Sequence, residues 1–122
     1  MEPRAVIGDK GLEFYFKKRR VFSWLWSELK LINIHTEAVH YPPGYKMKEH
    51  FEKEYVVQFV GSGVDKTVRL WYFPFDLGRQ DLIIQSIKEF GGAINRVKII
   101  DLPHDSNIKE CDRDYERMNK LL

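Results

Sequence analysis

Several features that mark common protein classes are scarce in this chain of 122 residues. The single cysteine, Cys111, excludes an internal disulfide and is typical of a reducing compartment. No window approaches the roughly 18 apolar residues that a membrane-spanning helix needs, and the N-terminus lacks the apolar core of a signal peptide. The net charge is only +2, so overall charge does not indicate nucleic-acid binding. These absences predict a cytoplasmic protein with no transmembrane segment.

Sequence motifs for catalysis and for metal binding are also missing. The four histidines and Cys111 show neither His-x-x-x-His nor Cys-x-x-Cys spacing. The glycines at 61 and 63 lie between two expected strands, so no helix follows them to bind a phosphate group. His40 and His50 flank a proline-rich stretch with Glu49 and Glu52 nearby, so a site could assemble there, although ordinary surface histidines are the simpler interpretation. The sequence therefore predicts a protein that is not an enzyme and has no cofactor or metal site.

The residues that are present indicate one folded domain rich in β-structure. Hydrophobic residues make up 43% and charged residues 31% of the chain, as in ordinary globular proteins. The aromatic share of 14% is high and favours strands. Residues 21–34 carry two of the three tryptophans, and Phe22, Trp24 and Trp26 alternate onto one face of an expected strand. We expect this stretch to organise the core, with a kink at Ser27-Glu28.

Hydrophobic periodicity and turn signals place the remaining elements. Strands are expected at 4–7, 12–16, 30–40, 54–60 and 67–73, with an exposed loop at 41–53. Residues 80–90 have the spacing of an amphipathic helix, capped by Asp76 or Gly78 and ended by Gly91-Gly92. A further strand at 96–102 and a second helix at 106–122 follow. The residues expected in the core are Trp24, Trp26, Leu29, Ile32, Val57, Phe59, Leu70, Ile83, Ile87 and Phe90.

The order of these motifs resembles that of the bacterial pleckstrin-homology-like (PH-like) domains over residues 4–91. The resemblance rests on a turn at Gly8-Asp9-Lys10-Gly11-Leu12, the step Trp26-Ser27-Glu28-Leu29, then Ile32, and the helix Gln80 to Phe90. It implies an α+β fold, mainly antiparallel β, with a bent sheet or small barrel capped by the helix. The expected organisation is a PH-like domain at 1–103 and a C-terminal helical extension at 104–122. The alternative architecture is another α+β sandwich in which the strand at 96–102 joins the main sheet.

The resemblance also implies a function, because members of this superfamily are mostly binding modules for lipid headgroups, peptides or proteins. We expect a non-enzymatic binding or scaffold domain that contacts another protein. The alternative is weak binding of anionic lipid, or less plausibly of nucleic acid, through a run of four cations. A solvated hairpin tip with no ligand is the simplest interpretation of that run. The candidate anion-binding residues are Lys17, Lys18, Arg19 and Arg20.

The C-terminal segment predicts a partner surface. Apolar residues there recur three and four apart, the spacing of a narrow helical stripe. An isolated helix of this length is marginal in water, so the stripe needs a surface to pack on. We expect that surface to belong to the same chain or to a second copy, with a slight preference for a homodimer. The residues of the stripe are Ile108, Cys111, Tyr115, Met118 and Leu122.

Overall fold

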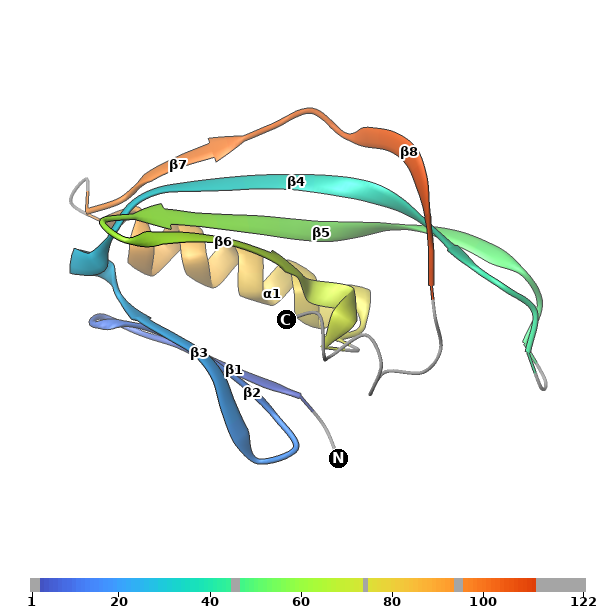
Figure 1. Cartoon of the computed structure of the whole chain (residues 1–122), viewed down its shortest axis with the longest axis horizontal. Coiled ribbons are helices and arrows are strands. Elements are labelled where there is room, and N and C mark those ends of the chain that lie inside the picture. Colours follow the sequence, from blue (N-terminus) through green and yellow to red (C-terminus); the bar gives the residue numbers. More distant parts are fainter. Residues whose placement is uncertain (1–2, 45–46, 74, 94–95, 112–122) are drawn as a thin grey trace.

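Two β-sheets and one helix make up the fold (Figure 1), in a computed structural model that describes residues 3–44, 47–73, 75–93 and 96–111. The architecture is α+β, as the sequence predicts. The strands are β1 (Arg4–Ile7), β2 (Gly11–Phe16), β3 (Arg19–Leu25), β4 (Leu29–Tyr41), β5 (His50–Gly61), β6 (Val64–Arg69), β7 (Lys98–Asp101) and β8 (Asp105–Glu110). The helical elements are α1 (Leu77–Ser86), its π-helical continuation Ile87–Gly91, and the short 3-10 helices Trp26–Glu28 and Leu70–Tyr72.

The smaller sheet is an antiparallel meander of β1, β2 and β3 in sequence order. Strand β2 confirms the predicted alternation at Leu12 and Phe14, which are buried, whereas Glu13 between them is half-exposed; Phe16, predicted on the same face, is half-exposed as well. The 3-10 helix Trp26–Glu28 forms the predicted kink and leads the chain into the larger sheet.

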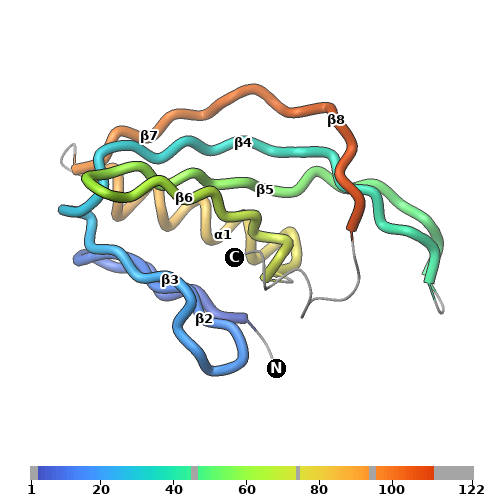
Figure 2. The backbone as a smooth tube through the Cα atoms, viewed as in Figure 1, coloured from blue at the N-terminus to red at the C-terminus, as the bar shows by residue number. Residues whose placement is uncertain are grey.

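The larger sheet is built around β4. Its order is β6-β5-β4-β7, and β8 also pairs with β4. β5 pairs with β4 antiparallel, whereas β7 and β8 follow each other along its opposite edge in parallel (Figure 2). The predicted strand at 96–102 thus joins the main sheet, as in the alternative architecture. Neither sheet closes into a barrel among the described residues.

The helix and the small sheet cover the same face of the large sheet (Figure 1). Asp76 begins α1 as its N-cap, with the side chain accepting a hydrogen bond from the Arg79 N–H at 2.8 Å. Eight of the ten predicted core residues are buried here, and Trp24 and Phe90 pack against them half-exposed. Trp26 is 2% exposed and donates its indole N–H to the Gly8 carbonyl at 2.7 Å. Buried aromatic rings join the layers, with Phe14 of β2 near Phe59 of β5.

The predicted C-terminal helix is wrong over its first turns. Residues Asp105–Glu110 form strand β8 and pair with Glu37 to His40 of β4. The open edge of β4 offers backbone hydrogen bonds to this segment, and that tertiary gain overrides a charged, helix-like pattern. Ile108 is consequently 58% exposed while Cys111 is buried, so these two do not form one stripe. Tyr115, Met118 and Leu122 lie outside the described residues.

The exposed loop predicted at 41–53 is shorter in the structure. β4 runs without interruption to Tyr41 and β5 begins at His50, so eight residues (42–49) connect them. The paired ends of β4 and β5 extend beyond the rest of the sheet (Figure 1). Residues 50–53 alternate between polar and apolar side chains, as expected for a strand with both faces open to solvent. Their polar character alone made a loop the expected structure.

No helix within the described ranges has both the length and the apolar character needed to cross a lipid bilayer.

Candidate functional site

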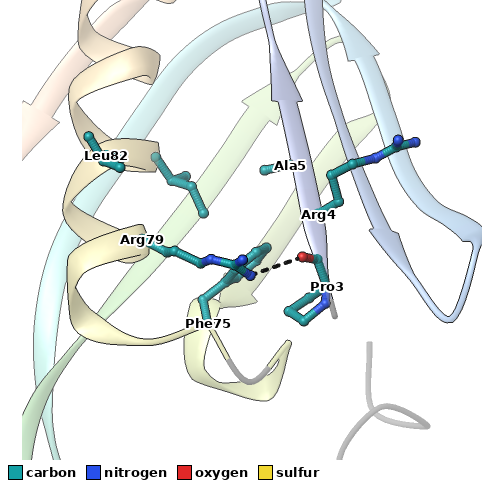
Figure 3. Close-up of a pocket in the computed structure, with 7 residues that line it drawn as sticks. Pro3, Arg4, Ala5, Phe75, Arg79 and Leu82 are labelled. Carbon is teal, nitrogen blue, oxygen red and sulfur yellow. Dashed lines mark hydrogen bonds between the residues drawn. The ribbon is translucent and has the colours of Figure 1, made fainter. Parts of the chain in front are cut away.

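A groove runs between strand β1 and helix α1 (Figure 3). Its wider part measures about 230 Å³ and includes Ala5 of β1 together with Arg79 and Leu82 of α1. A second hollow of about 190 Å³ shares Ala5 and Leu82 and extends to Ile7. The shared residues show that the two hollows are neighbours along β1, and we treat them together as one groove. We call it the β1 groove, lined by Pro3, Arg4, Ala5, Ile7, Phe75, Arg79, Leu82, Ile83 and Ser86.

The backbone of β1 leaves hydrogen-bonding groups along this groove. The Gly8 N–H donates to the Gly11 carbonyl at 3.0 Å. This bond shows which residues of β1 form hydrogen-bonded pairs with β2. Because bonded pairs alternate in an antiparallel ladder, the N–H and C=O groups of Ala5 and Ile7 point to the outer edge. Among the described residues, β1 has β2 as its sole strand neighbour. The outer edge of β1 therefore has the geometry of an acceptor for one more strand.

The side chains of α1 give this groove an apolar wall and a positive end. Leu82 is 62% exposed beside Ile83, which is buried under the helix. The Arg79 guanidinium reaches the edge and donates to the Pro3 carbonyl at 3.4 Å (Figure 3). Arg4 lines the same end of the groove. Its side chain points away from α1 (Figure 3), and its guanidinium lies 4.4 Å from the centre of the Tyr15 ring. Two arginines thus mark the N-terminal end of β1.

The predicted basic run forms the tip of the second hairpin, between β2 and β3. Lys17 and Lys18 occupy its turn with positive φ angles of 54° and 63°, and Arg19 and Arg20 begin β3. All four are exposed. Figure 1 shows this tip on the same side of the small sheet as the start of β1. We call residues 17–20 the basic tip.

A buried polar cluster fixes the start of α1 to the edge of β5. The amide of Gln80 accepts from the Tyr55 N–H at 2.9 Å and donates to the Phe75 carbonyl at 2.9 Å and to the Glu54 carboxylate. Glu54 also accepts a hydrogen bond from the Tyr41 hydroxyl. Burial raises the pKa of Glu54, and these two donors oppose that rise. Each of these bonds joins separate elements, which indicates a structural role for the cluster.

His40 and His50, which flank the proline-rich stretch, contact different side chains and do not form one site together. His40 places one ring nitrogen 2.6 Å from Glu110 and the other 2.7 Å from Glu49. The Glu110 hydrogen bond, and then that of Glu49, raises the pKa of His40, while partial burial opposes the rise. His50 instead stacks on the Tyr41 ring with centroids 4.7 Å apart. The arrangement around His40 ties β4 to β8 and to the connection before β5.

A group of three metal-ligating side chains meets where β8 joins β4. His35 and Glu37 of β4 and Asp105 of β8 each offer one ligand atom, and these atoms lie within 4.8 Å of one another. The familiar metal-binding spacings His-x-x-x-His and Cys-x-x-Cys do not include this group, so they give no sign of it in the sequence. The spacing His35-x-Glu37 on a strand was the available signal, since alternate residues share a face. Asp105 could not be found that way, because only the β4–β8 pairing brings it there.

Two residues predicted to form the partner surface, Ile108 and Cys111, lie within the described ranges, and they do not share one surface. Ile108 lies exposed on β8, whereas Cys111 packs within the chain against Val39 and Trp71. The homodimer remains a prediction. Comparisons with known proteins add no relative to these observations: no protein-family model, no curated protein and no solved structure matches this chain.

Proposed function

We propose that this protein is a non-enzymatic binding domain that takes up an extended segment of another protein as an added strand on β1. The observation that carries the proposal is the outward-pointing backbone of Ala5 and Ile7 beside the groove. In strand addition, main-chain hydrogen bonds supply affinity and side-chain pockets supply specificity. The resemblance to PH-like domains agrees with a binding role.

The chemistry of the groove favours a particular kind of segment. Side chains of an added strand alternate, so every second residue would face α1 and meet the exposed side of Leu82. Arg79, Arg4 and the basic tip gather at one end of β1, where they attract a negatively charged partner. The proposed ligand is therefore an extended peptide with alternate apolar residues and acidic residues toward one end.

A random peptide library displayed on phage tests this proposal. We expect selection on the protein to enrich acidic peptides with alternating apolar residues. Ala5→Pro should abolish their binding, because it removes an outward N–H that the β1–β2 ladder does not use. Leu82→Glu should weaken the binding by placing a charge in the groove. The matched control is Leu102→Glu, at an exposed leucine outside the groove, which should bind as the parent protein does.

Two results would reject strand addition. One is a selection that enriches no peptide above a resin control. The other is an enriched peptide whose affinity is the same for Ala5→Pro, Leu82→Glu and Leu102→Glu, with circular dichroism showing all three folded.

The basic tip supports a second candidate function, binding to an anionic lipid surface. The left-handed backbone of Lys17 and Lys18 favours glycine or asparagine and costs other residues about 1–2 kcal/mol each. Lysines at such positions agree with a use for their charge. Each cation near an anionic membrane contributes about 1 kcal/mol. Vesicles with phosphatidylserine should then sediment the protein at low salt, and changing residues 17–20 to glutamine should prevent it. Equal sedimentation with neutral vesicles would remove this candidate.

A further inference from the structure

The pairing of β8 with β4 brings together a donor set suited to a metal ion. His35 and Glu37 are two residues apart on β4, so their side chains leave the same face of the sheet. Asp105 is the register partner of Glu37 across the parallel ladder. The three ligand atoms, one nitrogen and two oxygens, lie within 4.8 Å of one another. Two of the residues come from one strand and the third from a distant part of the sequence.

The carboxylate of Glu37 supplies an independent indication. The residue is 0% exposed, and its Oε1 accepts hydrogen bonds from Arg69 Nε at 2.8 Å and from Trp71 Nε1 at 3.0 Å. Its Oε2 is sealed from solvent and has no hydrogen-bond partner among the described residues. An unsatisfied buried oxygen of a charged group is costly, and a cation at Oε2 would remove that cost. Glu37 therefore has one oxygen held in place by the protein and one with coordination capacity left.

We propose that His35, Glu37 and Asp105 bind one divalent transition-metal ion, with zinc as the ion that fits best. Zinc takes imidazole nitrogen and carboxylate oxygen together, and three protein ligands leave its fourth position to water. Calcium and magnesium prefer all-oxygen sites, so the histidine disfavours them. Ligand atoms about 2.1 Å from a shared ion lie at most about 4.2 Å apart, so binding requires small side-chain movements at most. His35 and Asp105 are only half-buried and can make them.

The groups already bound to this cluster determine what the ion must displace. Asp105 Oδ1 accepts from the Asn107 N–H at 2.9 Å, and Oδ2 accepts from Lys109 Nζ at 3.3 Å. The long, partly exposed lysine side chain swings away when an ion takes its place, whereas Arg69 stays on the other oxygen of Glu37. The bound ion links β8 to β4 through side chains in addition to the backbone ladder. Zinc should therefore raise the melting temperature of the protein.

Zinc titration of EDTA-treated, buffer-exchanged protein tests the site. Isothermal calorimetry should show one zinc ion per chain, and the melting temperature should rise with zinc concentration. His35→Gln and Asp105→Asn should each lower the affinity by about tenfold or more. The matched control is His104→Gln: His104 is next to Asp105 in sequence, but its ring bonds to Thr36 at 2.7 Å. This variant should bind zinc as the parent does.

The variants avoid Glu37, since removing it would leave Arg69 and Trp71 without their acceptor and could unfold the protein. Absence of saturable zinc binding would overturn the proposal and assign Oε2 to a buried water. Binding that His104→Gln weakens as much as His35→Gln would also overturn it, because that result is expected of scattered surface histidines.

Discussion

Replacement of Trp26 by alanine should destabilise this protein more than most single substitutions. The indole is 2% exposed and lies where the small sheet, the large sheet and the end of the helix meet. A Cβ added at Gly91 would lie 2.8 Å from the Trp26 ring, which shows how closely the helix end approaches it. Replacing a buried aromatic residue by alanine costs about 3–5 kcal/mol, through lost burial and the cavity left behind. The lost bond to the Gly8 carbonyl adds little, because Gly8 is half-exposed and water can reach it.

Urea unfolding followed by tryptophan fluorescence and circular dichroism measures this cost. A loss of about 3–5 kcal/mol is a large share of the roughly 5–15 kcal/mol that holds an ordinary domain together. The control is Leu25→Ala, one residue away and 51% exposed, which should change the stability by less than about 0.5 kcal/mol. A loss below about 1 kcal/mol for Trp26→Ala would refute the view that residues 21–34 organise the core.

Three further predictions test other parts of the structure. Asp76→Ala should lower the free energy of unfolding by about 1 kcal/mol in a urea melt, because it removes the N-cap of α1; an unchanged melt would argue against the cap. Gly61→Ala should cost at least about 2 kcal/mol, since its Cβ would lie 1.9 Å from the Glu28 carbonyl oxygen, whereas Gly8→Ala meets nothing within 4 Å and should be neutral. The raised pKa of His40 stabilises the fold below its ordinary value of 6.5, and this contribution should be lost as pH rises through the folded-state pKa. His40→Gln should flatten that part of the stability–pH curve, and an identical curve for both proteins would contradict the assignment.

Local patterns in the sequence predicted the elements whose stability is mostly local. The hairpins of the small sheet and the strand at 54–60 follow from β-branched and aromatic runs bounded by turn signals, and α1 follows from its spacing and from Asp76. β8 could not be predicted in this way, since its charged sequence has no apolar alternation. It is a strand because β4 has a second edge to pair with, and that edge exists only in the folded chain.

The candidate sites also differ in whether they depend on local sequence or on contacts between distant segments. The basic tip was visible as a cation run between two strands, and the structure places it at a hairpin turn as predicted. The β1 groove depends on sheet order and on the position of α1, neither of which the residues 4–7 specify. The group formed by His35, Glu37 and Asp105 depends on the β4–β8 register. Contacts between distant segments are thus what the sequence patterns missed.

The position of β4 between early and late strands has a consequence for synthesis on the ribosome. β5 and β6 emerge soon after β4 and can pair at once, because antiparallel neighbours need only short turns. The other edge of β4 stays unpaired until β7 and β8 are synthesised, because these strands follow the helix in the sequence. Until Glu110 has left the exit tunnel, a nascent chain exposes unpaired backbone along β4, and such edges recruit other strands. Chaperone demand should therefore be greatest in the interval between completion of α1 and release of β8.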